Sequence, residues 1–314
     1  MNYMKREVTV IGGITADIEG VPQEDLKLQD SNPGVIRISH GGVGRNITEN
    51  LARLGISVGL VSAAGEDFVG ISAKNELEGL GVDVSQVALY PEESTAMYLS
   101  ILNILGDMEM GLCNMDVLEK ITMERLHPLI PWLKDSQILC LDTNLSEELL
   151  GDLTDELEGH LLFLDPVSVA KASRARKHIG RFHTVKPNRM EAEELSGLTI
   201  LSEEDLNRAG DWFLAQGVTR LFITLGSGGV YFREGKEQGL LPVKNTVLKS
   251  ATGAGDAFSA AVLLGHLRQW DVRKTAEIAM IASQIAMESK APVNPCMGME
   301  RLLKEREKGE KAHA

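Results

Sequence analysis

Residues 251–258 read Ala-Thr-Gly-Ala-Gly-Asp-Ala-Phe and lie between a polar run and an apolar run of the chain. Small residues followed by helix-forming residues predict a turn whose backbone N–H groups point outward at the start of a helix, where positive partial charge gathers. We expect an anion hole there, formed by Gly253, Ala254 and Gly255, with Asp256 beside it as the base for a hydroxyl group. Two interpretations fit this stretch alone: phosphoryl transfer to an alcohol, or a helix with an acidic first turn after a glycine-rich loop.

The composition excludes some classes of partner. The chain has 314 residues, 43% of them hydrophobic, which is enough for a buried core. Its formal net charge of −13 argues against nucleic acid, because binding to a polyanion depends on clustered Lys and Arg. A small anionic ligand remains compatible with this charge, since backbone dipoles can bind it locally. No apolar run reaches membrane-spanning length, so we expect no membrane partner.

The cysteines indicate the redox compartment. Cys113, Cys140 and Cys296 are odd in number and form no CxxC pair, which predicts neither a disulfide framework nor a zinc site. Residues 1–7 are mostly polar and charged, so we expect no targeting segment. We therefore expect a cytoplasmic protein.

A glycine turn follows the first predicted strand. Residues 8–11 are apolar and precede Gly12 and Gly13, which is typical of the opening of a parallel α/β sheet. The dinucleotide-binding alternative is weak, because the third glycine of GxGxxG is missing. Asp17 lies just past this strand, where open α/β sheets bind ligands. Its carboxylate could accept hydrogen bonds from two sugar hydroxyls, and a plain turn residue is the alternative.

A second glycine cluster precedes a predicted helix. Gly41 and Gly42 leave room for a ligand to contact the backbone. From Asn46 onward the apolar residues up to position 54 share one helical face, and Gly55 supplies the stop. Asn46, in the first turn, offers its amide group to a hydroxyl.

Strand and helix patterns alternate regularly from residue 132 onward, which is typical of a parallel sheet covered on both faces. Two strand pairs, at about 18–40 and 94–112, interrupt the alternation nearer the N-terminus. We predict a single α/β domain over residues 1–314, with a mostly parallel central sheet, helices on both faces and a small β-sheet lid. An exposed lid sheet favours a homodimer that pairs through lid edges.

Polar residues follow two further predicted strands. Asn188 and Glu191 have the spacing of a helix N-cap and its partner, and capping alone accounts for both. Helix capping does not explain the presence of Lys186 just before this pair. A cation beside an amide and a carboxylate could also bind triphosphate oxygens and a hydrated Mg²⁺. The glycine-rich turn at 224–230 would permit close approach to a nucleotide.

Together these motifs resemble those of the ribokinase-type (PfkB) carbohydrate kinases, over residues 8 to about 289. Both family signatures are present, Gly-Gly-Val-Gly-Arg-Asn at 41–46 and Gly-Ala-Gly-Asp at 253–256. The resemblance implies a ribokinase-like fold, ATP as phosphoryl donor and Mg²⁺ as cofactor. It also implies that Asp256 is the catalytic base and that the amides of Gly253, Ala254 and Gly255 hold the transferring group.

The same resemblance assigns the binding residues by position. The sugar-binding positions are Asp17, Gly41, Gly42 and Asn46. The ATP-binding positions are Lys186, Asn188, Thr224, Gly226 and Gly228. Asn188 and Glu191 match the Asn-x-x-Glu motif that organises magnesium and phosphate.

Within the family, segments 30–34, 41–51, 144–148, 165–168 and 186–189 are most similar to the pseudouridine kinases, which phosphorylate the 5′-hydroxyl of a C-glycoside nucleoside. Arg45, before Asn46, contributes to this similarity. Such a site must hold a ribose, to which Asn144 could bond, and a uracil. The polar residues expected to read the uracil edges are Ser31, Asn32, Tyr98 and Asn114. The alternatives are another ribose-recognising kinase of the family and a non-catalytic nucleoside sensor.

The sequence departs from the family at one cation position. Many members have an aspartate six residues before the catalytic one, where it helps to bind potassium, and this chain has Ser250. Activation by a monovalent cation is therefore left open.

Overall fold

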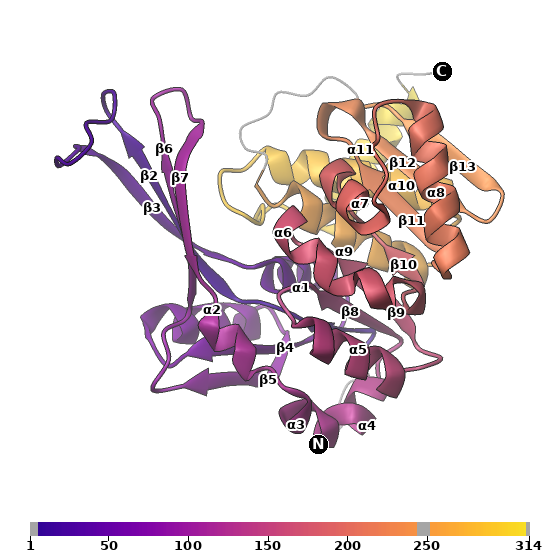
Figure 1. Cartoon of the computed structure of the whole chain (residues 1–314), viewed down its shortest axis with the longest axis horizontal. Helices are drawn as coiled ribbons and strands as arrows, with labels where there is room; N and C mark the ends of the chain where they lie inside the picture. The colour runs from indigo at the N-terminus through magenta and orange to yellow at the C-terminus, as the bar shows by residue number, and fades with distance from the viewer. Residues whose placement is uncertain (1–5, 244–251, 312–314) are drawn as a thin grey trace.

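The computed structural model describes residues 6–243 and 252–311, with side chains described up to residue 308 (Figure 1). Within these residues the main sheet has nine strands in the order β13-β12-β11-β10-β9-β8-β1-β4-β5. Their bounds are β1 (Val8–Ile11), β4 (Val58–Gly65), β5 (Asp83–Tyr90), β8 (Ile138–Asp142), β9 (Leu161–Asp165), β10 (Thr184–Val185), β11 (Arg220–Thr224), β12 (Val230–Glu234) and β13 (Glu237–Leu241).

All neighbours from β11 to β5 pair in parallel, and the β12–β13 hairpin adds two antiparallel strands at one edge. The central strands β1 and β8 are buried along their whole length, as expected for short apolar strands covered on both faces. The predicted mostly parallel sheet is therefore confirmed.

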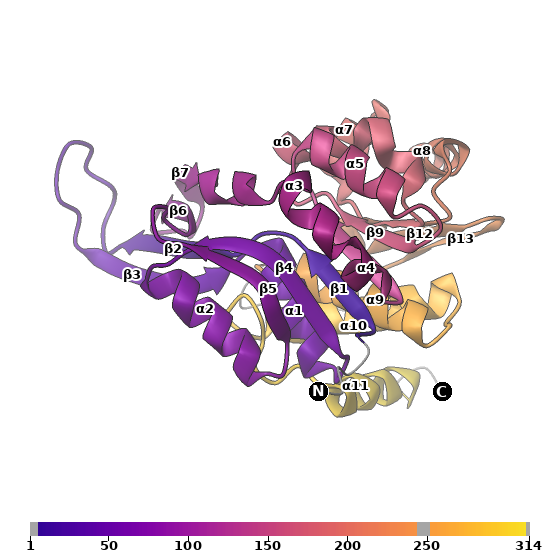
Figure 2. The same ribbon diagram turned by 90° about the horizontal axis from the view of Figure 1, so that it is seen from below.

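Helices cover both faces of this sheet, and Figure 2 shows the two layers on either side of it. One layer consists of α1 (Val43–Arg53), α2 (Phe68–Gly79), α9 (Ala254–Leu267), α10 (Val272–Met287) and α11 (Met299–Lys311). The other consists of α3 (Met123–Leu126), α4 (Ile130–Lys134), α5 (Glu147–Glu156), α6 (Val169–Ala172), α7 (Arg189–Ser196) and α8 (Glu203–Gln216). Each layer packs its apolar side chains against the sheet, which produces two hydrophobic clusters, one on each face.

A small sheet extends away from the main one (Figure 1). Its strands run in the order β3-β2-β6-β7. Their bounds are β2 (Thr15–Pro22), β3 (Gly34–Gly41), β6 (Ala96–Leu102) and β7 (Met108–Asn114). The two predicted strand pairs thus form one sheet, in which β2 and β6 pair in parallel.

The two faces of the small sheet differ in chemistry, because side chains alternate along each strand. One cross-strand row consists of Ser39, Asp17, Tyr98 and Cys113, and we call this side the polar face. The next row consists of Ile38, Ile18, Leu99 and Leu112, and we call that side the apolar face.

Several elements differ from the sequence-based predictions. Helix α1 begins at Val43, before the expected start at Asn46, because a distant carboxylate bonds the free N–H of Gly44 in its first turn. Within the predicted strand–helix alternation, the segment after β9 is not one continuous helix, because α6 is followed directly by a 3₁₀ segment, Ser173–Arg181. Strand β5 and the β12–β13 hairpin were not predicted, since their pairing partners rather than their own patterns define them.

Candidate active site

Five parallel strands end at one edge of the main sheet, where open α/β folds bind ligands. Each places a residue there: Gly12 after β1, Asp142 at the end of β8, Asp165 at the end of β9, Lys186 after β10 and Thr224 at the end of β11. The start of α9 is tied to this edge, because Ser259 Oγ donates a hydrogen bond to Asp165 Oδ2 at 2.8 Å. The main sheet and α9 therefore bring the Gly-Ala-Gly-Asp signature at 253–256 to the ligand-binding edge.

The N-terminus of α9 has the geometry of an anion hole. Gly253 is its N-cap, with a left-handed φ of 77°. A side chain there would overlap the carbonyl oxygen of Pro292, so the position requires glycine. The first N–H group to bond within the helix is that of Ala257, to Gly253 O at 3.0 Å. The amides of Ala254 and Gly255 therefore have no intrahelical acceptor and face the open end of the helix.

Asp256 lies in the first turn of α9, beside these amides. Its Oδ2 accepts a hydrogen bond from Asn46 Nδ2 at 2.8 Å, which joins the signature at 41–46 to the signature at 253–256. Burial raises the pKa of Asp256 to about 7, and the charge of Asp165 adds to this rise, while Asn46 and Lys186 oppose it. A carboxyl group with this pKa can accept a proton near neutral pH.

Asp17 and the early glycines form the neighbouring wall. Thr15 Oγ1 donates to Asp17 Oδ1 at 2.8 Å. Burial raises the pKa of Asp17, and Thr15 and the positive charge of Arg45 oppose this shift. A side chain at Gly41 would overlap the Asp17 carboxylate, and one at Gly42, where φ is 95°, would overlap the carbonyl oxygen of Gly13. Glycine at both positions is thus a steric requirement.

Asp142, which the sequence reasoning did not single out, joins the loops after β1 and β8 to the first turn of α1. Its Oδ2 accepts hydrogen bonds from the N–H groups of Gly13 and Gly44 at 2.9 and 3.0 Å. Asn144 donates to the same carboxylate from its side chain at 3.0 Å and from its backbone at 2.9 Å. Burial raises the pKa of Asp142, and these donors oppose the rise. Asn144 Oδ1 in turn accepts from Lys171 Nζ at 2.6 Å, so the predicted ribose contact is rigidly placed.

Lys186 lies between the end of β9 and the start of α9. It is buried, and its Nζ lies 2.9 Å from Asp165 Oδ2. The same nitrogen is 3.4 Å from the position that a Cβ on Gly255 would occupy, directly beside the anion hole. Although burial acts against it, the pKa of Lys186 is raised by Asp165 and Glu191, so the side chain stays charged.

Asn188 and Glu191 form a capping box at the start of α7, as predicted. Asn188 donates to the two oxygens of Glu191 from its backbone and its side chain, both at 2.8 Å. Burial raises the pKa of Glu191, and the charge of Lys186 opposes the rise. Thr224 lies beside Asn188 in a β-bridge. Gly226 and Gly228 follow in a 3₁₀ turn, so the predicted nucleotide residues are neighbours in space.

The four predicted uracil-reading residues are spread over the small sheet. Tyr98 shares the polar face with Asp17, as its register partner on β6. Asn114 pairs with Met97, which places it on the opposite face from Tyr98. Ser31 and Asn32 lie in the exposed loop between β2 and β3, where Asn32 bonds Lys27 and Asp30. Of the four, Tyr98 is therefore the best placed to contact a ligand bound at Asp17.

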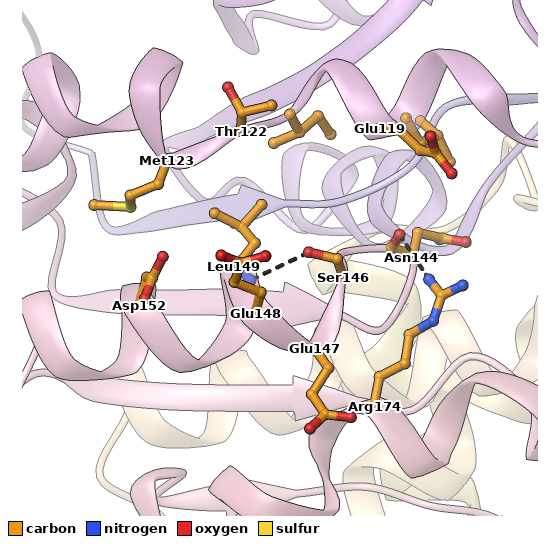
Figure 3. A pocket seen from close by; sticks show the side chains of 12 residues that line it. Glu119, Thr122, Met123, Asn144, Ser146, Glu147, Glu148, Leu149, Asp152 and Arg174 are labelled. Carbon is orange, nitrogen blue, oxygen red and sulfur yellow. Dashed lines mark hydrogen bonds between the residues drawn. The ribbon is translucent and has the colours of Figure 1, made fainter.

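A cavity of about 510 Å³ lies beside Asn144, next to the first turns of α5 (Figure 3). Its charged lining consists of Glu119, Glu147, Glu148, Asp152 and Arg174. Arg174 Nη1 donates to the carbonyl oxygens of Thr143 and Asn144 at 3.2 and 3.1 Å, so its charge supports the loop. An acidic lining does not suit a phosphate group, and Asp256 does not border this cavity. We place the candidate active site at the start of α9 instead.

Comparison with known proteins shows the family to which the chain belongs. Residues 5–297 match the model of the pfkB family carbohydrate kinases. The chain belongs to this family. It is 35% identical to the pseudouridine kinase of Escherichia coli K12, over 95% of this chain and 96% of that protein. A solved structure from Clostridium perfringens is 30% identical, with a TM-score of 0.84 over 98% of this chain and 97% of that one. The Arabidopsis thaliana ribokinase solved with ribose and ATP has 19% identity and a TM-score of 0.83, over 96% of this chain and 98% of that one.

Membership of the family makes the protein a kinase that phosphorylates an alcohol group, with a ribokinase-like fold. Kinases of this family use ATP and Mg²⁺. Within residues 6–243 and 252–311, no cluster of three or more His, Cys, Asp and Glu side chains has the arrangement of a metal-binding site. No helix in the described part of the chain is long and apolar enough to cross a membrane. Ser250, at the potassium position, lies outside the described residues.

Sequence reasoning missed two buried carboxylates that bond several residues of the candidate site, Asp142 and Asp165. Each one ends an apolar strand at the ligand-binding edge. That position was the signal that could have found them.

Proposed function

We propose that this kinase transfers the γ-phosphoryl group of ATP to the 5′-hydroxyl of pseudouridine, giving pseudouridine 5′-phosphate and ADP. The observation that carries the reaction type is the position of the Asp256 carboxyl beside the amides of Ala254 and Gly255, which have no acceptor within α9. The similarity to the Escherichia coli pseudouridine kinase supports the choice of acceptor.

Asp256 acts as the general base in this proposal. Its carboxylate takes the proton of the 5′-hydroxyl as that oxygen attacks the γ-phosphorus and the bond to the bridging oxygen of ADP breaks. The pKa of about 7 supports this role, because a base of that strength is ionised at slightly alkaline pH and still holds a proton well. Asn46, bonded to the carboxylate at 2.8 Å, aims it.

Charge on the transferring group is stabilised from the other side. The amides of Gly253, Ala254 and Gly255 are expected to contact the phosphoryl oxygens, where the helix N-terminus favours negative charge. Lys186 Nζ, next to Gly255, adds a fixed positive charge at the same place. Positioning and charge stabilisation are most of what in-line phosphoryl transfer requires of a protein.

The ribose lies against the wall made by Asp17 and the early glycines. Asp17 accepts hydrogen bonds from two neighbouring hydroxyls, while Gly41 and Gly42 leave the space that a sugar needs. Asn46 and Asn144 supply further polar contacts. For the uracil, Tyr98 is the best placed of the small-sheet residues, since the amide of Asn32 is bonded within its own loop. Contacts of uracil with Ser31 and Asn114 remain part of the proposal.

ATP and Mg²⁺ are assigned to the edge formed by β10, β11 and α7. Both oxygens of Glu191 already accept bonds from Asn188, so this pair suits a magnesium ion held through water rather than directly. A bound Mg²⁺ would neutralise charge on the phosphates. Lys186 and Thr224 lie along this edge, with Gly226 and Gly228 in the adjoining turn, where the glycines admit the nucleotide.

We also propose a cytoplasmic homodimer. The three cysteines are free, which suits a reducing compartment. On the apolar face of the small sheet Ile36, Ile38 and Leu112 are 73%, 66% and 60% exposed. Exposed apolar side chains gathered on one sheet face are typical of an interaction surface. A second copy would cover this face, rather than the strand edges considered from the sequence.

A substrate panel tests the proposed function. Pseudouridine, uridine and ribose are compared in a coupled ADP-release assay with Mg·ATP, and the Asp256→Asn variant measures the background. Pseudouridine should give the highest kcat/KM. A preference for ribose would assign the chain to another branch of the family, and no turnover of any acceptor, with binding intact, would favour a nucleoside sensor.

A further inference from the structure

Arg45 touches both the small sheet and the residue that contacts the catalytic base. Its Nη1 donates to the carbonyl oxygen of His40 on β3 at 3.1 Å and to Asn46 Oδ1 at 2.9 Å. Asn46 Nδ2 then donates to Asp256 Oδ2 at 2.8 Å. A continuous hydrogen-bonded path thus leads from the base of the small sheet through Arg45 and Asn46 to Asp256.

The guanidinium of Arg45 is itself held firmly. Its side chain is 3% exposed and is paired with Glu49 on the same helix. Its Nη2 also lies 3.2 Å from Glu76 Oε2 on α2, and His40 Nδ1 lies 2.6 Å from the same oxygen. Contacts from α1, α2 and β3 therefore fix the group that bonds the Asn46 oxygen.

The orientation of the Asn46 amide decides which form of Asp256 is favoured. With Oδ1 bonded to Arg45, only the NH₂ group can face Asp256, and a donor there stabilises the carboxylate. If the amide turned over, its NH₂ group would face the donors of Arg45, which is unfavourable. Without Arg45 the turned amide becomes accessible, and its oxygen would accept a hydrogen bond from protonated Asp256. That form of the carboxyl cannot act as a base.

We propose that Arg45 is a positioning residue for Asp256, which acts by holding the Asn46 side-chain amide with its N–H groups toward the carboxylate. The inference rests on the proposed function, in which Asp256 is the base. It gives a physical reason for arginine at the position between the early glycines and Asn46.

The effects of other charged groups on the pKa of Asp256 must be distinguished from the effect of Arg45 through Asn46. Asp165, Lys186 and Asp17 influence the proton affinity of Asp256 directly. Around Arg45 the charged or titratable neighbours are Glu49, Glu76, His40 and Asp17. A test must therefore remove Arg45 together with Glu49, whose buried carboxylate would otherwise lose one of its two cation partners, Arg45 and Arg53, and must include a variant that keeps the positive charge.

Two variants and one matched control meet these conditions. Arg45→Met with Glu49→Gln removes the ion pair as a unit. Arg45→Lys keeps the charge but loses the planar guanidinium, whose Nη1 bonds His40 O and Asn46 Oδ1 while Nη2 faces the carboxylates. Arg53 also pairs with Glu49 and donates to Pro295 O at 3.1 Å. Arg53→Met with Glu49→Gln is therefore the control, since it removes the same charges from the same helix.

The measurement is the pKa of Asp256, from ¹³C NMR of protein labelled at the Asp carboxyl carbon, with the signal assigned by its loss in Asp256→Asn. We expect the pKa to rise by roughly half a unit to one unit in both Arg45 variants and to stay near the wild-type value in the control. The low-pH limb of the kcat profile should move upward by the same amount. An Asp256 pKa in Arg45→Lys that matches wild type would overturn the proposal, even if the double variant does not fold.

The NMR readout needs no turnover, so it distinguishes two failures. A protein that phosphorylates none of the acceptors contradicts the proposed function, whatever the NMR result. An active kinase whose Asp256 pKa and pH profile do not respond to Arg45 contradicts only the role given to Arg45.

Discussion

Asp142 and Asp165 are register partners at the carboxyl ends of the neighbouring strands β8 and β9. The carboxylate of Asp142 accepts hydrogen bonds from backbone N–H groups on the proposed acceptor side. That of Asp165 bonds Lys186 and Ser259 on the proposed phosphate side, at 2.9 and 2.8 Å. Two adjacent strand ends therefore organise the two halves of the site, which leads to separate predictions for each half.

Asp142→Asn should weaken acceptor binding selectively. The introduced NH₂ group must face at least one N–H donor of Gly13, Gly44 or Asn144, and the unpaired group costs about 1–3 kcal/mol of stability. We expect KM for pseudouridine to rise roughly tenfold while KM for ATP changes little. Steady-state kinetics and urea unfolding check this, with the exposed Asp152→Asn as control. Equal changes in both KM values would argue against a role confined to the acceptor side.

Lys186→Met should lower both stability and turnover. The substitution leaves Asp165 buried without its cation, which costs roughly 3–5 kcal/mol. Adding Asp165→Asn should restore most of the stability but not kcat, because the positive charge beside Gly255 is still missing. Thermal unfolding and kcat of the single and double variants separate the two effects. Recovery of kcat in the double variant would show that Lys186 serves only the fold.

The free energy of unfolding should depend on pH through the titration of Asp256. Its pKa rises from an ordinary value of 3.8 to about 7 on folding, so the folded state binds the proton more strongly between these pH values. Stability is therefore lost as pH rises from about 4 to 7 and is level above that, as far as this group is concerned. Asp256→Asn should be more stable than wild type by roughly 1–4 kcal/mol at pH 8, and the difference should shrink toward pH 4. Urea titrations at the two pH values check this, and a difference independent of pH would contradict it.

Ile38→Lys should break the proposed homodimer. Ile38 lies on the apolar face of the small sheet and is 66% exposed, so a charge there has no cost in the monomer but a large one inside an interface. Sedimentation velocity should show wild type as a dimer and the variant as a monomer. Ser100→Lys, on the polar face, is the matched control. A wild-type monomer at micromolar concentration would contradict the dimer.

The sequence predicted the elements whose own residues determine them. The apolar strand at Val8–Ile11, the capping box of Asn188 and Glu191, and the glycine turn before Asp256 each follow from a local pattern. Contacts between distant residues were not accessible in this way. Nothing near Asp142 in the sequence shows that it will bond Gly13 and Gly44, and the early start of α1 depends on that bond. Local patterns also could not show on which face of the small sheet Asn114 lies, because this depends on the register between β6 and β7.

The central claim is that Asp256 takes the proton of the acceptor hydroxyl, and single-turnover kinetics of Asp256→Asn with saturating pseudouridine and Mg·ATP test it most directly. We predict that the phosphoryl-transfer rate falls by roughly 10²–10⁴-fold while calorimetry shows pseudouridine binding close to that of wild type. A variant that binds pseudouridine and transfers the phosphoryl group at more than about a tenth of the wild-type rate would contradict the assignment of Asp256 as the base.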